Sequence, residues 1–413
     1  MSNPYEIYDL KRNPFPFKAI ASLRLEDIGP FVPFKKGITK NLEFLIKATM
    51  ETKRWIGIPL VGPIGSGKTR LLIHLKDLMK KKYGKKIKCI IIENPGLSLR
   101  EFYSKFITEL IETREIIYII ITKFENEILK ILKSNFRTSV TSYLNGESIY
   151  LAGNLKKTYE DIKNTFIKDI ISDEDVALSL AILSVYYIVN EGVYSPHINF
   201  SKEIDLTSDY RAALDFLKGK KISERHADRL GYISRQLSDP RIANYSFASI
   251  IKILKLDGTE VVFLFVDQFE KIIEKLSKKD KLDLLDSYRS LIDNNLFNFS
   301  AIFGCTTESW VVSEQVNPSF ADRFNKTIEI PKIDIVMAKN LVKKYSDLHR
   351  ISKKYIGTYF PFNEKSIRKI LEESDSIRDF LENCFKILYR AAHDKEKKIT
   401  ENLVSKFIRL GII

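Results

Sequence analysis

A run of consecutive residues carries the clearest chemistry in the sequence: Gly62, Pro63, Ile64, Gly65, Ser66, Gly67, Lys68 and Thr69. At the glycines, backbone N–H groups can turn toward a polyphosphate because no Cβ blocks the approach. Lys68 would place a positive charge on the outer phosphates, and the Thr69 hydroxyl is a ligand that suits Mg²⁺. The motif, with the adjoining Arg70, therefore predicts a binding site for ATP or ADP with Mg²⁺.

The segments on either side of this motif suit a phosphate-binding loop. Residues 56–61 are apolar and predict a buried strand, and the leucines after Thr69 recur at helical spacing. A helix that begins near Lys68 directs its positive end toward the phosphates. Strand, loop and helix in succession favour a phosphate site over a chance glycine-rich turn.

A second apolar segment supplies an acidic residue for the metal. Residues 261–266 are β-branched and aromatic, and Asp267 follows them directly. In a parallel sheet, the carboxyl ends of the strands meet at one edge, where the phosphate loop also begins. We therefore predict that Asp267 holds Mg²⁺ together with Thr69. The alternative is an aspartate that caps the helix that follows.

Hydrolysis of a triphosphate needs a group that orients or deprotonates water. After Asp267 the chain continues Gln268-Phe269-Glu270. If a helix begins here, Glu270 could face the site and is our first choice for the base. Gln268, which could orient water without accepting a proton, is the second. The alternative role for Glu270 is a first-turn carboxylate that the helix dipole favours.

Three polar residues further along the chain complete the candidate set. Thr306 ends a strand predicted at residues 300–306 and could bond the γ-phosphate or the attacking water, or it could cap the next helix. Arg323 could stabilise phosphate charge in a neighbouring subunit, or pair with Asp322 or another surface acid. Arg378 lies near the start of a predicted helix and could reach the nucleotide, or it could be a solvated helix residue.

Strands alternate with helices after the phosphate loop, which predicts an α/β fold with a parallel sheet covered on both faces. The segments that predict strands are residues 56–61, 89–93, 261–266, 300–306 and 327–330.

The long helical segment between the second and third predicted strands suggests an insertion. A connection of about 150 residues is too long for neighbouring strands of one sheet. We expect an N-terminal extended arm, a nucleotide-binding core in two pieces, an inserted α-helical domain and a C-terminal helical lid domain. Their expected bounds are, in that order, residues 1–37, 38–96 with 257–331, 97–256 and 332–413.

Composition narrows the class of protein. The 413 residues are 44% hydrophobic and 29% charged, which permits large cores and excludes a disordered chain. The three cysteines lie far apart, so we expect them to be reduced and not to bind metal. The formal net charge of +14 favours a partner such as nucleic acid, or it reflects ordinary solubility. The lysines within residues 80–88 have the same two interpretations.

No segment of the sequence indicates a membrane. The first residues lack the apolar stretch of a signal peptide, and the longest apolar run, residues 176–189, is too short to cross a bilayer. We therefore expect a cytoplasmic protein without membrane contact.

The ordered set of phosphate loop, Asp267, Thr306, Arg323 and Arg378 resembles that of AAA+ P-loop ATPases of the origin-initiator-like branch. Residues 8–16, which read YDLKRNPFP, resemble the opening of ExeA-type and TniB-type ATPases. Residues 213–219 and the DQFE of residues 267–270 are similar to ATP-binding proteins of BREX-type phage defence. The DQFE pattern also recurs in signalling NTPases of the STAND group.

The resemblance implies a nucleotide-switched ATPase that remodels or gates a DNA-linked assembly, in replication, segregation, transposition or phage defence. Arg323 would then act between subunits of a homo-oligomer or on a partner protein, and Arg378 would couple the lid. Residues 399–413 are too short for the winged-helix domain of origin initiators, which argues against an origin-binding protein of that kind.

Two further hypotheses remain open. Gln268 stands where the family usually has a catalytic glutamate, so the chain could be a scaffold or signalling module that binds ATP with little hydrolysis. A metabolite kinase is a third hypothesis, although those enzymes rarely carry so long an insertion together with a helical tail.

Overall fold

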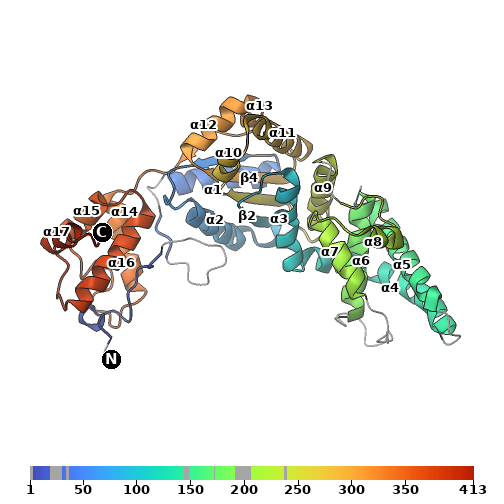
Figure 1. The fold of residues 1–413 in the computed structure, drawn as a ribbon, viewed down its shortest axis with the longest axis horizontal. Helices are drawn as coiled ribbons and strands as arrows, with labels where there is room; N and C mark the ends of the chain where they lie inside the picture. Colours follow the sequence, from blue (N-terminus) through green and yellow to red (C-terminus); the bar gives the residue numbers. More distant parts are fainter. Residues whose placement is uncertain are drawn as a thin grey trace.

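The computed structural model describes residues 3–18, 30–33, 37–143, 148–171, 173–190, 206–236 and 240–413. The predicted N-terminal arm and the predicted insertion therefore lie partly outside the described residues. A central sheet has helices on both faces, and a group of helices follows it at one side. The C-terminal helices within residues 335–409 lie at the other side, and we call them the lid after their predicted role (Figure 1). Both chain termini lie at the lid.

In the part of the chain that the structure describes, five parallel strands form one sheet in the order β2-β3-β4-β1-β5. Strands β1, β3 and β4 are buried along their whole length, as a sheet covered on both faces requires. The prediction of an α/β fold with a parallel sheet is confirmed. The strands are β1 Gly57–Val61, β2 Ile87–Glu93, β3 Val261–Asp267, β4 Phe299–Cys305 and β5 Ile328–Glu329.

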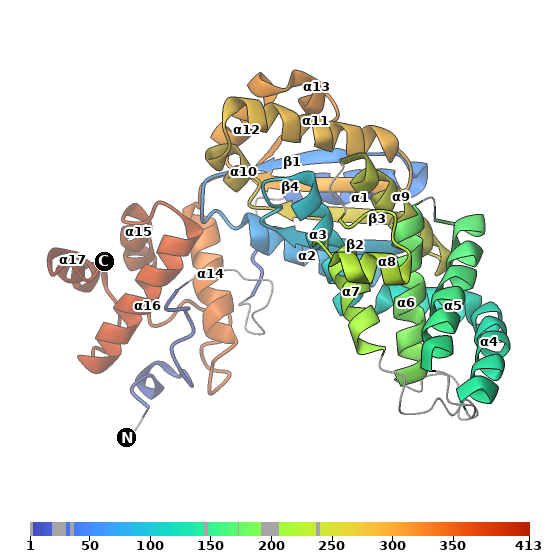
Figure 2. The same ribbon diagram turned by 45° about the vertical axis from the view of Figure 1, so that its right-hand side comes forward.

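Side chains of β3 alternate between the two faces of the sheet. Phe263 and Phe265 pack with helices α1 (Ile38–Thr52) and α2 (Lys68–Tyr83) in one apolar cluster. Val262, Leu264 and Val266 belong to a second cluster on the opposite face. That face is covered by α3, α9 and the helices that follow β3 and β4, and Figure 2 shows α11, α12 and α13 together on this side. These helices are α3 Leu99–Glu112, α9 Pro240–Leu256, α10 Glu270–Lys275, α11 Lys278–Asn294, α12 Thr307–Val316 and α13 Pro318–Ala321.

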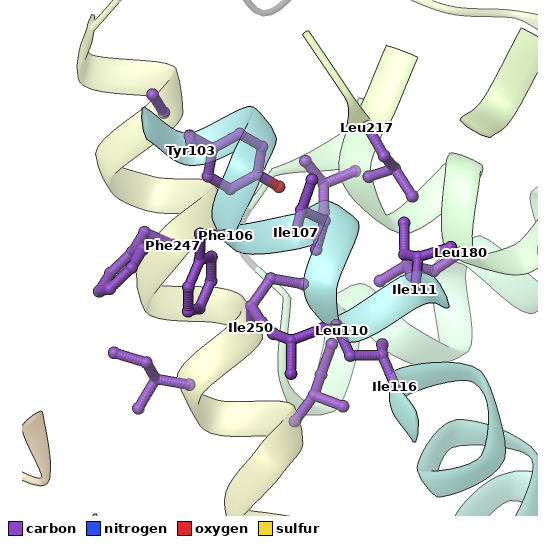
Figure 3. Close-up of a cluster of buried hydrophobic side chains, with 14 of the residues drawn as sticks. Tyr103, Phe106, Ile107, Leu110, Ile111, Ile116, Leu180, Leu217, Phe247 and Ile250 are labelled. Carbon is purple, nitrogen blue, oxygen red and sulfur yellow. The ribbon is translucent and has the colours of Figure 1, made fainter. Parts of the chain in front are cut away.

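The helical region shares its core with the sheet. Phe106 and Leu110 of α3 pack against Phe247 and Ile250 of α9, and the same cluster continues to Leu180 of α6 (Figure 3). Because one cluster of buried residues crosses from sheet to helices, the division into a separate inserted domain stays a prediction. The remaining helices of the region are α4 Glu115–Tyr143, α5 Ser148–Asp169, α6 Glu174–Asn190, α7 Thr207–Leu217 and α8 Glu224–Leu230.

The lid is built from both ends of the chain. Its core contains Tyr8, Leu10 and Phe15 as well as residues of the C-terminal helices. Arg350 donates from Nη1 to the carbonyl oxygen of Tyr8 at 2.9 Å, and the Tyr8 hydroxyl donates to the carbonyl oxygen of Glu396. The predicted arm is thus packed into the lid where it is described. The elements here are η1 Glu6–Tyr8, α14 Ile335–Asp347, α15 Glu364–Glu372, α16 Ile377–His393 and α17 Glu401–Arg409.

None of the described helices is both long and apolar enough to cross a membrane.

Candidate functional site

The glycine-rich loop joins β1 to α2 in a conformation that its sequence explains. Gly65 and Gly67 have φ values of 76° and 93°, in the left-handed region that other residues rarely adopt. Helix α2 begins at Lys68, whose Nζ donates to the carbonyl oxygens of Gly62 at 2.7 Å and Pro63 at 2.9 Å. Burial lowers the pKa of Lys68, and the nearby charges of Glu270 and Asp267 oppose that shift. The loop therefore holds a buried ammonium against neutral carbonyl groups.

Asp267 and Thr69 lie in direct contact at the carboxyl edge of the sheet. The Thr69 hydroxyl donates to Asp267 Oδ2 at 2.5 Å, and Asp267 is 1% exposed. Gly304 of β4 allows this placement, because a Cβ there would lie 3.2 Å from Asp267 Oδ1. Burial raises the pKa of Asp267, and the hydrogen bond from Thr69 opposes that shift.

These two oxygen ligands fit magnesium. Mg²⁺ prefers oxygen donors and is usually held by one or two protein groups together with phosphates and waters. The described residues contain no group of three or more His, Cys, Asp or Glu side chains that could hold a metal by themselves. A hydroxyl and a carboxylate beside a phosphate loop match the donor set that a nucleotide-bound magnesium requires.

Gln268 and Glu270 have different surroundings. Gln268 has a φ of 59°; its Nε2 donates to Glu93 Oε1 at 3.3 Å, and its Oε1 accepts a hydrogen bond from Lys271 Nζ. Glu270 is the first residue of α10, and its buried Oε2 has no hydrogen-bond partner among the described residues. Burial raises the pKa of Glu270, and its own backbone N–H and Lys68 oppose that shift. Both ends of the Gln268 amide are therefore engaged, whereas one oxygen of Glu270 is not.

The lid touches the phosphate loop through the start of α16. The backbone N–H of Arg378 donates to the carbonyl oxygen of Gly65 at 3.3 Å. Ser376 caps α16, and a Cβ on Gly65 would lie 2.6 Å from its Oγ. Arg378 also contributes to the lowered pKa of Lys68, after burial. The predicted position of Arg378 beside the phosphate loop is thus what the structure shows, while its role toward a nucleotide stays a prediction.

A cavity of about 580 Å³ brings most of the predicted residues together. Its wall includes a second buried oxygen without a hydrogen-bond partner among the described residues, Ser66 Oγ. Ser66 and Glu270 thus each bring to the cavity wall a polar side-chain oxygen that could bond a ligand after a small side-chain movement. The predicted residues that line it are Ile64, Gly65, Ser66, Gly67, Lys68, Thr69, Arg70, Asp267, Gln268, Glu270 and Arg378.

Sequence reasoning missed a large part of the cavity wall. The N-terminal arm and the segment of α14 with the two residues that follow it supply both apolar and polar residues of the wall, and Lys271 joins from α10. The available signal was the run of prolines and aromatics at residues 13–17, which is typical of an extended arm but does not indicate what the arm contacts. The missed residues include Arg12, Asn13, Phe15, Phe31, Val32, Lys271, Glu274, Tyr345 and His349.

Thr306 and Arg323 lie outside the residues that line this cavity. Thr306 caps α12: its Oγ1 accepts from the Ser309 N–H at 3.2 Å and donates to the Ser309 hydroxyl at 2.9 Å. Arg323 forms a two-bond ion pair with Asp293, with Nε to Oδ1 at 2.6 Å and Nη2 to Oδ2 at 3.1 Å. The observed partner of Arg323 is therefore Asp293 and not its neighbour in sequence, Asp322.

The place of Arg323 in the fold restricts what it can reach. The next residue, Phe324, bridges to Gly57, the first residue of β1, whereas the phosphate loop follows the last. Arg323 thus lies near the amino end of β1, across the sheet from the cavity of its own chain. Any contact between Arg323 and a phosphate would have to involve another molecule, and that role stays a prediction.

The sheet order and the glycine-rich loop after β1 together form an AAA+-type P-loop fold. Strand β4 lies between the strand that leads into the phosphate loop and the strand that ends in Asp267, and a helical lid contacts the loop. The prediction of an AAA+-type fold is confirmed.

Comparisons with known proteins give structural neighbours only. No family model and no curated protein matches the sequence. The ORC2 protein of Aeropyrum pernix, with ADPNP and ADP, has a TM-score of 0.44 and 10% identity over 92% of this chain and 69% of that one. The ORC1 protein of Aeropyrum pernix in complex with DNA has a TM-score of 0.42 and 11% identity over 92% and 66%. Cdc6p of Pyrobaculum aerophilum has a TM-score of 0.42 and 12% identity over 91% and 66%.

This chain spans about two thirds of the length of those proteins. At such low similarity these neighbours carry no argument, and the fold class is assigned from the sheet order and the phosphate loop.

Proposed function

We propose that this protein binds ATP with Mg²⁺ and hydrolyses it, and that the nucleotide controls the position of the lid. The observation that carries the proposal is that one cavity is walled by the phosphate loop, by Asp267 and by the lid residue Arg378. A ligand in this cavity touches two parts of the protein at once, so its charge can bias their relative position.

Each residue has a role that its surroundings support. The N–H groups of the loop and the start of α2 bind phosphate oxygens, and Lys68 adds a positive charge. Thr69 and Asp267 hold Mg²⁺, which supplies charge stabilisation at the outer phosphates when bound. Glu270 takes the proton of the attacking water, because burial raises the pKa of its carboxyl toward the range of a useful base. Arg378 senses the outer phosphate from the lid.

Steady-state ATP hydrolysis with Mg²⁺ tests these roles. Glu270→Gln should lower kcat about 100-fold or more, because proton transfer contributes roughly 10²–10⁴-fold to catalysis, while ATP affinity should remain. Lys68→Ala should instead lose nucleotide affinity. Glu127→Gln, which neutralises an exposed carboxylate on α4, is the matched control and should behave as wild type. Unchanged kcat in Glu270→Gln would refute the assignment of the base.

We further propose that the protein works in the cytoplasm as a remodelling or gating subunit of a DNA-linked assembly in replication, segregation, transposition or phage defence. The net charge of +14 supports contact with a polyanion. Because Arg323 lies near the amino end of β1 and does not line its own cavity, the contact with phosphate that we propose for it would be made in a neighbouring copy. ATP hydrolysis measured against protein concentration, with and without DNA, tests both points. A rate per molecule that is independent of concentration and unchanged by Arg323→Ala would refute the oligomeric mechanism.

A second candidate is a scaffold or signalling module that binds ATP and barely hydrolyses it, in line with the resemblance to STAND and BREX-type proteins. The observation that favours it is that both ends of the Gln268 amide already bond neighbouring side chains, Glu93 and Lys271, which restricts how the amide can turn toward a water. This candidate predicts nucleotide that copurifies with the protein and negligible turnover at every concentration. Rapid turnover that Glu270→Gln abolishes would eliminate it.

A further inference from the structure

Gln268 links two charged residues at the edge of the sheet. Its amide nitrogen donates to Glu93 Oε1 at 3.3 Å, and its amide oxygen accepts from Lys271 Nζ. Glu93 ends β2 directly beside Asp267, the last residue of β3. An amide can serve both neighbours at once, because it carries a donor group and an acceptor group.

A glutamate at position 268 would interact differently with both Glu93 and Lys271. Its carboxylate would have no proton to donate to Glu93, and the two negative charges would repel at this distance. It would also pair with the ammonium of Lys271 and neutralise it. The amide of Gln268 therefore holds Lys271 by a hydrogen bond, but it carries no negative charge that would neutralise the ammonium group.

The backbone around Gln268 is held firmly enough to fix this arrangement. Gln268 has a left-handed φ of 59°, a conformation that a residue with a side chain rarely adopts. Hydrogen bonds on either side maintain it: the Asn94 N–H donates to the Asp267 carbonyl at 3.0 Å, and the Phe269 N–H donates to the Gly304 carbonyl at 3.0 Å. A strained residue that its surroundings hold in place often serves a site rather than stability.

Lys271 has the properties of a ligand-binding cation. It lines the same cavity as Lys68, Thr69 and Glu270. Among the residues that the structure describes, no carboxylate forms a salt bridge with it, whereas Lys88, Lys163 and many other lysines have such partners. An ammonium that a neutral amide holds at the wall of a nucleotide cavity is available to a phosphate.

We propose that Lys271 is a second phosphate-binding cation of this site, selective for the triphosphate over the diphosphate, and that Gln268 is the positioning residue that holds it. The proposal rests on the proposed binding of ATP, which puts Mg²⁺ and the attacking water beside Asp267 and Glu270. Lys271 directly follows Glu270 in α10 and lines the same cavity, so it would meet the outer phosphate that ATP has and ADP lacks. Gln268 replaces a carboxylate here because the position serves to place a positive charge and not to accept a proton.

Calorimetric titration with ADP and with a non-hydrolysable ATP analogue, both with Mg²⁺, tests the proposal. Lys271→Met should weaken binding of the analogue about tenfold, which corresponds to about 1.4 kcal/mol, and should leave ADP binding within about twofold. Lys271→Arg, which keeps the charge, should restore most of the affinity for the analogue. Lys275→Met removes an exposed lysine from the same helix and should match wild type on both ligands.

Gln268→Glu supplies an independent variant. Its carboxylate should pair with Lys271, so binding of the analogue should weaken while ADP binding is retained. Equal loss for both ligands in Lys271→Met, or no loss for either, would overturn the role of Lys271 while leaving ATP binding intact. A wild-type protein that binds neither ligand would refute the proposed function itself and this proposal with it.

Discussion

Replacing Gly65 with alanine should separate the lid from the phosphate loop. Gly65 has a φ of 76°, and an added Cβ would lie 2.6 Å from Ser376 Oγ, 3.0 Å from Ser376 Cβ and 3.1 Å from Arg378 Cβ. Real Cβ atoms essentially never show the first of these distances, so either the phosphate loop or the start of α16 must shift. Because the backbone of Arg378 also bonds the Gly65 carbonyl, this movement should disturb the contact that joins the lid to the loop.

The expected loss of folding stability in Gly65→Ala has two parts. A left-handed φ costs an alanine about 1–2 kcal/mol, and forcing an extra methyl group into a packed contact costs roughly 1–3 kcal/mol. The chain offers a control that isolates the second part. Gly357, also in the lid, has a φ of 77°, and nothing lies within 4 Å of its added Cβ. Gly357→Ala should therefore carry the backbone cost alone.

The assay is chemical unfolding together with nucleotide titration for both variants. We expect Gly65→Ala to lower the free energy of unfolding by roughly 1–3 kcal/mol more than Gly357→Ala and to weaken ADP binding about tenfold. Gly357→Ala should bind ADP as the wild type does. Equal loss of stability in the two variants, with unchanged ADP affinity in Gly65→Ala, would refute the inference that the lid contact contributes to the nucleotide site.

Three other changes follow from the described contacts. Burial raises the pKa of Glu270, so the ionised carboxylate destabilises the fold at neutral pH. Glu270→Gln should therefore raise the Tm of the nucleotide-free protein at pH 7.5. This gain should vanish as the pH falls below the ordinary glutamate pKa of about 4.3, where the side chain is protonated in both the folded and the unfolded state. A gain that persists in acid would contradict this. Phe320 is fully buried, and its ring contacts those of Phe269, Phe303 and Phe324. Phe320→Ala should therefore lower the free energy of unfolding in urea by about 3–5 kcal/mol. A decrease below about 1 kcal/mol would show that the cluster repacks. Asp293→Ala releases the partly exposed Arg323 and should change the free energy of unfolding by no more than about 1 kcal/mol; a larger loss would mean that the pair is structural.

The sheet could be predicted from the sequence because its strands are short apolar runs that end in polar residues. Residues 261–266 with Asp267 show this pattern most clearly, and the strand observed is Val261–Asp267. The phosphate loop was equally readable, since Gly65 and Gly67 both adopt the positive φ that only glycine tolerates easily. Local sequence decides such features.

Contacts between distant segments could not be read in the same way. The arm joins the lid through bonds such as Arg350 to Tyr8, which are 342 residues apart in sequence. The sequence also could not show which contacts two polar residues make: Thr306 caps a helix, and Arg323 pairs with Asp293. Their roles at the nucleotide and between subunits remain predictions. Lys271 carried no signal of its own, since an exposed helix lysine and a cavity lysine look alike in a sequence.

The incorporation of Tyr8, Leu10, Phe15 and Val32 into the core of the lid has a mechanical consequence. The lid is attached to the rest of the molecule by two stretches of chain, one that leads toward α1 and one that leaves β5. The N–H of Arg378 also bonds the carbonyl of Gly65, so a shift of the lid would act on the phosphate loop as well as on these two stretches. The ring of Phe31 stacks on His74 of α2 at 3.8 Å between ring centroids, so the first attachment is fastened to the helix that begins at the phosphate loop. The proposed movement of the lid would therefore also strain the contact between Phe31 and His74, and so would be felt at the helix that begins at the phosphate loop.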